Sequence, residues 1–128
     1  MGSYLNPGGG LFRACRRSKI YVDKSNLITK TNEVLGTEQR FVCVSRPRRF
    51  GKSMAANMLA AYYGRDENAE NLFVDLKISA DPDFRTHLNQ YDVIRINVQE
   101  FLSASESMDE MLSMLQKRLL HGLKSQYP

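Results

Sequence analysis

Residues 41–53 read FVCVSRPRRFGKS: a short apolar run, a basic turn and the triplet Gly51-Lys52-Ser53. The apolar run, Phe41 to Val44, is typical of a strand that is buried on both faces of a parallel sheet. The residues after the triplet carry an apolar face at helical spacing, which predicts a helix over residues 53–63. A turn between a buried strand and a helix N-terminus presents backbone N–H groups that bind phosphate. Residues 46–53 are therefore predicted to form a phosphate-binding loop.

The predicted loop is a variant of the Walker A motif, G-x-x-x-x-G-K-[ST], in which Arg46 replaces the first glycine. Gly51 lets the backbone approach the phosphates because it carries no Cβ. Lys52 is expected to reach the β- and γ-phosphates of ATP, and the Ser53 hydroxyl is expected to bind Mg²⁺. The residues predicted to contact the nucleotide are Arg48, Arg49, Phe50, Gly51, Lys52, Ser53 and Met54. The two arginines have an alternative interpretation as surface charges at the rim of the loop.

The rest of the chain alternates between helix and strand patterns. Asp23 is placed to cap a helix that stops at Gly36, a short helix opens at residues 81–83, and residues 92–98 read as a second strand. Ser107 and Glu110 form a capping box before an amphipathic helix that continues to Leu123. Strands that alternate with helices predict an α/β fold, a P-loop NTPase-like parallel sheet flanked by helices. Cys43 is expected to be a small buried residue of that sheet.

The net charge of +4 is unevenly distributed over the 128 residues. Residues 1–53 hold 11 Lys or Arg against 3 acids, which gives +8, and residues 54–128 hold 7 against 11, which gives −4. A basic half attracts phosphate, whether the phosphate belongs to a nucleotide or to a nucleic acid. A nucleic-acid-binding module that uses this half is therefore the competing interpretation. Its contacts would come from a basic cluster that is otherwise a solvated face: Arg13, Arg16, Arg17 and Lys19.

The composition predicts a cytoplasmic protein. No apolar run approaches the roughly 20 residues that a membrane span needs. The first residues lack the apolar h-region of a signal peptide. Cys15 and Cys43 have no metal-binding spacing and do not make a disulfide framework.

Several strings resemble the bacterial AAA-ATPase-like family. Besides Phe41 to Ser53, they are Tyr4-Leu-Asn-Pro-Gly8, Tyr21-Val-Asp-Lys-Ser25, Met58-Leu59, Ala61-Tyr-Tyr63, Leu72-Phe73, Leu76-Lys-Ile78, His87-Leu-Asn89 and Tyr91-Asp-Val-Ile94. The family's loop has the same Arg-Pro-Arg-Arg-Phe-Gly-Lys-Ser sequence, so the resemblance implies that Arg46 is normal there. It implies a P-loop ATPase fold with additional strands. It also implies that Asp23 and Lys24 line the nucleotide site, although Asp23 is equally suited to capping a helix.

The resemblance further implies a longer parent protein, in which residues 1–128 are the N-terminal portion of the P-loop domain. Family members continue to a Walker B strand that ends in an Asp-Glu pair, and without that strand the sheet is expected to be incomplete. Asp75 follows only a short apolar run and Asp92 precedes its strand, so neither is assigned as a catalytic acid. We therefore expect this chain alone to hydrolyse ATP poorly or not at all. The alternative to a nucleotide-binding portion is an inactive truncated remnant. The macromolecular partners that the sequence suggests are a second copy of the chain or the missing C-terminal part of the parent.

Overall fold

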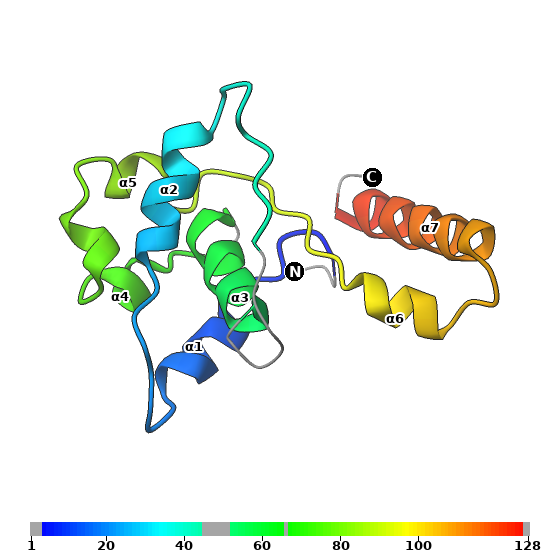
Figure 1. The fold of residues 1–128 in the computed structure, drawn as a ribbon, viewed down its shortest axis with the longest axis horizontal. Helices are drawn as coiled ribbons and strands as arrows, with labels where there is room; N and C mark the ends of the chain where they lie inside the picture. The colour runs from blue at the N-terminus through cyan, green and yellow to red at the C-terminus, as the bar shows by residue number, and fades with distance from the viewer. Residues whose placement is uncertain (1–3, 45–51, 66, 127–128) are drawn as a thin grey trace.

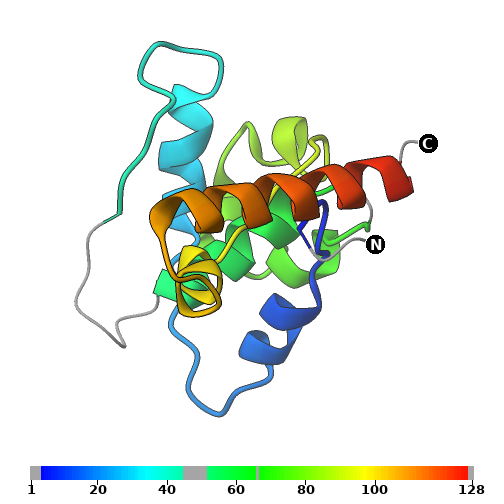
Figure 2. The same cartoon turned by 90° about the vertical axis from the view of Figure 1, so that its right-hand side faces the viewer.

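Helix α3 (Lys52–Tyr63) is the element around which the chain is arranged in this computed structural model, which describes residues 4–44, 52–65 and 67–126. The other elements are α1 (Gly10–Arg16), α2 (Asn26–Val34), α4 (Glu70–Phe73), the 3-10 helix η1 (Lys77–Ala80), α5 (Phe84–His87), α6 (Val98–Ser103) and α7 (Met108–Gln126). Helices α1, α2, α4 and α5 surround α3, whereas α6 and α7 form a hairpin that projects to one side (Figure 1). From the side of the hairpin, α7 lies across the front of this helical body (Figure 2).

The hydrophobic core lies between α3 and the short helices. Met58, Ala61 and Tyr62 are three and four residues apart, so they share one face of α3, and all three are buried. Phe12 of α1 stacks on Phe73 of α4 with 5.0 Å between the ring centroids. The Tyr62 ring lies edge-on to Phe73, and its hydroxyl donates a hydrogen bond of 2.6 Å to the carbonyl of Phe84. The core is therefore formed by aromatic side chains from four different helices.

Tyr63 joins α3 to α2 through its hydroxyl group. This hydroxyl donates to Oδ1 of Asn32 at 2.5 Å and lies 2.5 Å from Oγ1 of Thr31. Burial raises the pKa of Tyr63 to about 12, so the phenol stays neutral over the whole physiological range. A neutral phenol can donate and accept at once, which is what its position between Asn32 and Thr31 requires.

The predicted parallel sheet is wrong for the part of the chain that the structure describes. Residues 41–44 have no regular secondary structure there, Phe41 is 81% exposed, and Cys43 is exposed rather than buried. The second predicted strand contributes one isolated antiparallel bridge, between Leu5 and Ile94, and α6 already begins at Val98. A strand satisfies its backbone groups by pairing with a neighbour, and no described segment pairs with residues 41–44. The P-loop NTPase-like α/β prediction is therefore replaced by an arrangement of helices.

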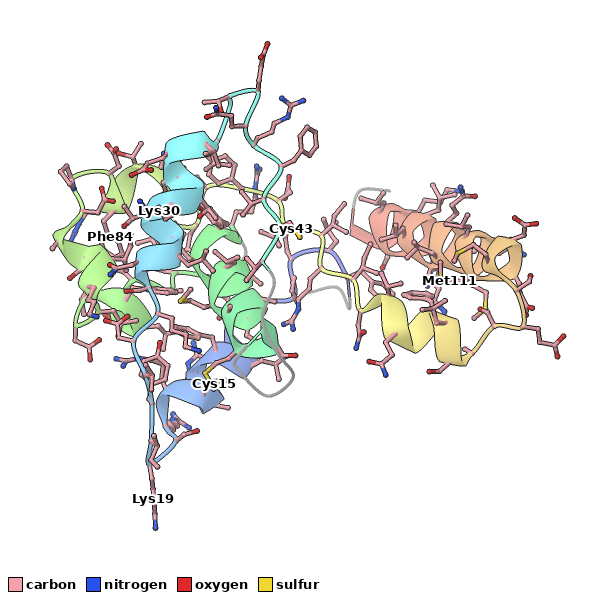
Figure 3. All side chains as sticks on the ribbon, viewed as in Figure 1. Cys15, Lys19, Lys30, Cys43, Phe84 and Met111 are labelled. Carbon is pink, nitrogen blue, oxygen red and sulfur yellow. The ribbon has the colours of Figure 1, made fainter. Side chains whose placement is uncertain are left out.

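The helix predictions after the loop are confirmed. α3 begins at Lys52, one residue before its predicted start, and ends at Tyr63 as predicted. α7 begins where the capping box placed it, because Oγ of Ser107 accepts a hydrogen bond of 3.2 Å from the N–H of Glu110. The carboxylate of Glu110 accepts from the N–H of Glu106 instead of Ser107, so only half of the box forms. Within the hairpin, Phe101 and Met111 are buried. Met111 lies on α7 (Figure 3), and exposed apolar residues of the same helix are Met108, Leu112, Leu120 and Leu123.

The hairpin is attached to the body through Tyr4 and the connection between α5 and α6. The carbonyl of Tyr4 accepts a hydrogen bond of 2.8 Å from the N–H of Arg95. The Tyr4 ring lies 5.7 Å from the ring of Phe101, and the guanidinium of Arg118 in α7 lies over Phe101. Nη1 of Arg118 donates to the Tyr4 hydroxyl at 3.4 Å. Tyr4 therefore contacts α6 and α7 as well as the connection that leads to them.

Candidate nucleotide-binding site

The first turn of α3 lies where the Walker A pattern requires a helix N-terminus. Ser53 is exposed in this turn and Met54 is partly buried. The turn contains no acidic residue, so no carboxylate within it opposes an anion at the positive end of the helix dipole. Of the predicted nucleotide ligands, the structure describes Ser53, Met54 and the backbone of Lys52. The remaining ones, Arg48, Arg49, Phe50 and Gly51, lie outside the described residues, as does the side chain of Lys52.

A very small apolar hollow, of about 10 Å³, lies against the first two turns of α3. It is lined by Phe12, Tyr21, Val22, Lys24, Met54, Ala55 and Met58. Of these residues, Phe12 and Met58 are buried, whereas Val22 is 60% exposed. The three segments that meet here are α1, the connection from α1 to α2, and α3, which lie close together at the lower end of the body in Figure 1. The hollow therefore adjoins the same turn of α3 that carries Ser53.

Asp23 connects the start of α2 to η1, and its carboxylate faces backbone groups. Oδ1 of Asp23 accepts from the N–H of Ser25 at 2.8 Å, and Oδ2 accepts from the N–H of Lys77 at 2.8 Å. Oγ of Ser25, which is buried, accepts from the N–H of Ile78 at 3.0 Å. Ser25, rather than Asp23, occupies the N-cap position of α2. Both carboxylate oxygens are thus engaged, and of the pair Asp23 and Lys24 only Lys24 lines the hollow.

The hydrogen bonds to Asp23 change its acidity. Burial raises the pKa of its carboxyl group, but the hydrogen bonds from Ser25 and Lys77 outweigh burial, so the pKa lies below its ordinary value of 3.8. The charged form is therefore favoured in the folded chain. A carboxylate whose pKa is lowered by backbone donors stabilises the folded chain at pH values above the pKa that it has in the unfolded chain. This contribution is lost as the pH falls through the pKa of the folded chain.

Replacing Asp23 with Asn should make the free energy of unfolding less dependent on pH in the acid range. At neutral pH the variant should be less stable, because the amide cannot accept from both N–H groups through two oxygens. The difference in free energy of unfolding should shrink as the pH falls below about 4, where the wild-type carboxylate becomes protonated. Urea unfolding at pH values between about 3 and 7 measures this difference in free energy, with Asp109→Asn on α7 as the control. A difference that stays constant down to the acid end would contradict this role of Asp23.

The two acids considered as substitutes for a Walker B acid are both engaged by arginines. Asp75 accepts two hydrogen bonds from Nη2 of Arg16, at 2.5 and 2.6 Å, which lower the pKa of Asp75. Asp92 lies 3.1 Å from Nε of Arg65. Among residues 4–44, 52–65 and 67–126, no three His, Cys, Asp or Glu side chains are grouped so as to hold a metal ion.

The basic cluster around α1 is partly neutralised by acids from later in the chain. Nη2 of Arg13 lies 3.6 Å from Glu67, and Arg16 is bound to Asp75. Arg17 and Lys19 are exposed, and Lys19 projects from the lower end of the molecule (Figure 3). An ion-paired arginine offers less attraction to a nucleic-acid backbone than a free one, so this cluster is a weaker phosphate-binding face than its sequence suggests.

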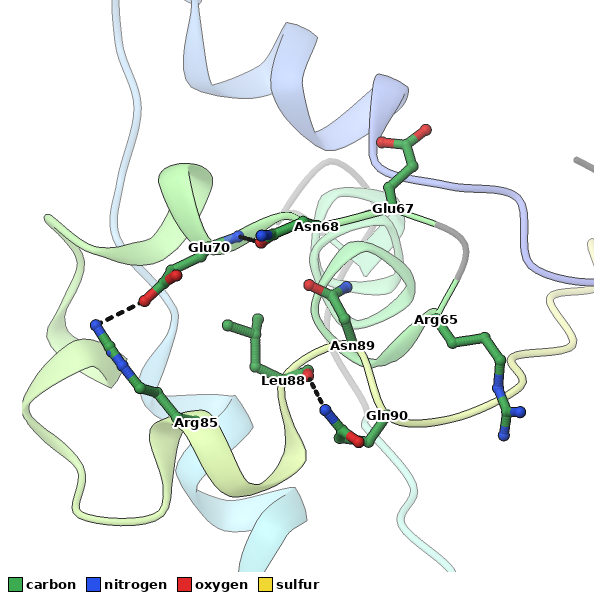
Figure 4. Close-up of a pocket in the computed structure, with 8 residues that line it drawn as sticks. All are labelled: Arg65, Glu67, Asn68, Glu70, Arg85, Leu88, Asn89 and Gln90. Carbon is green, nitrogen blue, oxygen red and sulfur yellow. Dashed lines mark hydrogen bonds and ion pairs between the residues drawn. The ribbon is translucent and has the colours of Figure 1, made fainter.

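A polar pocket of about 390 Å³ lies at the opposite end of α3 (Figure 4). It is lined by Arg65, Glu67, Asn68, Glu70, Arg85, Leu88, Asn89 and Gln90. Arg85 pairs with Glu70 at 2.6 Å, so the charge of this arginine is neutralised within the pocket. α3 is 12 residues long, or about 18 Å, and the pocket lies beyond its C-terminal end, whereas Ser53 lies in its first turn. Its balanced charges and its position make it unsuitable as part of a triphosphate site that starts at Ser53.

Sequence reasoning located the first turn of α3 but missed the hollow beside it. The string Tyr21 to Ser25 resembles the family, yet nothing in it indicates that Tyr21 and Val22 line a hollow together with Met54 and Met58. The sequence showed only that Phe12 is apolar, and it did not predict that this residue lines the hollow. Contacts between segments that are distant in sequence have no local pattern, so only the folded chain could bring these residues together.

Comparison with known families identifies the class of protein. Residues 12–128 match the family model AAA-ATPase-like, described as predicted AAA-ATPase, and the chain belongs to this family. Searches of curated proteins and of solved structures found no match. Membership supports nucleotide binding as the general activity. Separately, no described helix has the length and apolar character that crossing a membrane requires.

Proposed function

We propose that this chain binds ATP together with Mg²⁺ at the N-terminus of α3, as the N-terminal portion of an AAA-ATPase-like protein. The observation that carries the proposal is that α3 begins at Lys52, within the Gly51-Lys52-Ser53 triplet. A Walker A lysine and serine must stand in the first turn of a helix, where free N–H groups and the helix dipole attract phosphate. Family membership and the exposed position of Ser53 support the same proposal.

The groups of the proposed site have different roles. The backbone N–H groups of Arg49 to Met54 surround the phosphates, and Gly51 allows their close approach. The Lys52 ammonium neutralises the β- and γ-phosphates, and the Ser53 hydroxyl is a ligand to Mg²⁺. Arg48, Arg49 and Phe50 complete the loop. When bound, Mg²⁺ supplies charge neutralisation between the β- and γ-phosphates.

Calorimetric titration of the folded chain with Mg-ATP tests this function. We expect saturable binding that inorganic tripolyphosphate competes away, because the proposed contacts are to phosphates. Absence of ATP binding by a folded sample would contradict the proposal. Binding of duplex DNA that falls steeply with salt and ignores ATP would instead support the nucleic-acid interpretation.

The chain alone is expected to turn over ATP slowly, if at all. Hydrolysis needs an acid that acts on the metal or on the attacking water, and Asp75 and Asp92 are both engaged by arginines. A phosphate-release assay should give the same slow rate for wild type, Asp75→Asn and Asp92→Asn. A rate near 1 per second or above that either substitution abolishes would show that this assignment is wrong.

A further inference from the structure

The α6–α7 hairpin carries more apolar surface than its own two helices cover. α6 is 6 residues long, about 9 Å, whereas α7 is 19 residues long, about 28 Å, so α6 lies along only part of α7. Large apolar side chains remain exposed on both helices: Val98 and Leu102 on α6, and Met108, Leu112, Leu120 and Leu123 on α7. Exposed apolar residues that gather on one face indicate a site of association.

Four of the apolar residues of α7 form a continuous row along the helix. Met108, Leu112, Leu119 and Leu123 follow one another at intervals of four, seven and four positions, a spacing that repeats on one side of an α-helix. Leu119 is partly buried, and the other three are exposed. The row is about 22 Å long, which is most of the length of α7. Leu120 lies outside the row, because one further residue turns the helix by about 100°.

The exposed residues of α6 and the row of α7 lie on the same face of the hairpin. On α6, the exposed pair stands three residues before and one residue after the buried Phe101, and on α7 Met108 and Leu112 stand at the same two positions around the buried Met111. α6 and α7 run in opposite directions (Figure 1), and the guanidinium of Arg118 on α7 lies over Phe101. Seen from one end, antiparallel helices turn in opposite senses, so equal offsets from the buried contact place both exposed sets on one face.

The row on α7 is complementary to itself. Met108 and Leu123 are equally far from the middle of the row, and so are Leu112 and Leu119. When a second α7 lies antiparallel on the first, Met108 therefore meets Leu123 of the second copy, and Leu112 meets Leu119 of the second copy. A two-fold axis through the middle of the row relates the two helices, as in the commonest homodimer interfaces.

The charges of α7 favour an antiparallel pair over a parallel one. The first turn contains Asp109 and Glu110, and the last turn contains Lys124. In an antiparallel pair the acidic end of each helix lies beside the basic end of the other, whereas a parallel pair brings like charges together. Asp109 and Lys124 each directly follow a residue of the row, so they stand at its edge, where ion pairs between helices form. An anionic lipid surface would instead repel the acidic end of this face.

We propose that two copies of this chain associate through the exposed faces of their α6–α7 hairpins, with the two α7 helices antiparallel across a two-fold axis. The four helices form a bundle in which each copy covers the apolar row of the other. This interface lies on the hairpin, whereas the proposed nucleotide site lies at the start of α3 in the body. The two proposals are therefore independent of each other.

Sedimentation equilibrium of the wild-type chain over about 1 to 500 µM should show a reversible monomer–dimer equilibrium, because association follows mass action. Leu112→Asn should weaken dimerisation at least about tenfold, since it places one amide from each copy in the apolar contact. Leu120→Asn is the matched control: Leu120 is 54% exposed and Leu112 is 46% exposed, both lie on α7, and only Leu112 belongs to the row. Leu120→Asn should leave the dimer affinity within about twofold of the wild type.

Charge reversal tests the antiparallel direction of the pair. Lys124→Glu and Asp109→Lys should each weaken the dimer about tenfold, because each creates two like-charge contacts across the two-fold axis. An equimolar mixture of the two variants should recover the wild-type affinity, since each contact between positions 109 and 124 then joins opposite charges. Both variants are present unchanged in the mixture, so the recovery measures pairing across the interface and not the folding of either variant.

The outcomes decide between this interface and other forms of association. A chain that stays monomeric over the whole concentration range overturns the proposal. A dimer that Leu112→Asn and Leu120→Asn weaken equally, or assemblies that grow beyond two copies, overturn it as well. A mixture of the charge variants that dimerises no better than either variant alone overturns the antiparallel arrangement. Circular dichroism checks that each variant is folded, and the mixing experiment decides the question even where Leu112→Asn does not fold.

Discussion

Replacing Lys52 with Ala should reduce the affinity for Mg-ATP by about a hundredfold, or about 2.7 kcal/mol. In the proposed site, the Lys52 ammonium is the cation that neutralises the β- and γ-phosphates, and charge-assisted hydrogen bonds of this kind are roughly twice as strong as neutral ones. Alanine is a good helix former, so the start of α3 is retained. Calorimetric titration with Mg-ATP and with tripolyphosphate measures the loss, which should be similar for the two ligands.

Lys30→Ala provides the matched control for Lys52→Ala. Lys30 is exposed on α2 (Figure 3), so its removal takes away one positive charge without changing the proposed site. A general electrostatic effect would weaken binding to the same small extent in both variants, and it would disappear at high salt. If Lys52→Ala binds ATP as tightly as Lys30→Ala does, the Walker A interpretation of residues 46–53 is wrong.

Replacing Asn89 with Ala should destabilise the fold by about 3 kcal/mol. Asn89 has a φ of +55°, a left-handed conformation that Asn tolerates better than Ala does. Its Nδ2 donates to the carbonyl of Gly64 at 2.6 Å and to that of Ala61 at 3.0 Å, and its Oδ1 accepts from the N–H of Ala69 at 2.8 Å. The substitution removes the partners of these backbone groups at the end of α3 and the start of α4, and it adds backbone strain.

A second substitution separates the two contributions at Asn89. Asn89→Gly loses the same side-chain hydrogen bonds but tolerates a positive φ, so it should destabilise by about 1 kcal/mol less than Asn89→Ala. Asn26→Ala, at an exposed position in α2, should stay within about 0.5 kcal/mol of the wild type. Urea unfolding followed by circular dichroism gives the three values. An Asn89→Ala variant as stable as Asn26→Ala would show that this network does not stabilise the fold.

The parts of the fold that sequence predicted are those that depend on local pattern. α3 and α7 were predicted because their apolar residues recur at helical spacing and because Ser107 caps the second of them. Residues 41–44 do not form the predicted strand. A strand needs a neighbouring strand with which to pair, and the apolar sequence pattern does not specify that neighbour. Those four residues had the right composition for a buried strand, yet Phe41 and Cys43 are exposed.

Of the candidate site, the sequence predicted the helix that follows the loop. The triplet at residues 51–53 indicated where a helix must begin, and α3 begins at Lys52. The roles of Asp23 and Asn89 were not predictable, because their partners lie far along the chain: Lys77 is 54 residues from Asp23, and Ala61 is 28 residues from Asn89. Resemblance drew attention to the strings that contain both residues. It did not indicate that they bind backbone groups rather than a ligand.

The attachment of the hairpin through Tyr4 has a consequence for the order of folding. The hydrogen bond between Arg118 and Tyr4 joins residues 114 apart, and the bond between Val93 and Asn6 joins residues 87 apart. Closing such long loops costs chain entropy that the contacts repay only after the intervening segments are ordered. The body around α3 should therefore form first, and the docking of α6 and α7 onto Tyr4 should be a late step. During synthesis, the segment around Tyr4 is made early, whereas Arg118, its hydrogen-bond partner in α7, is made 114 residues later.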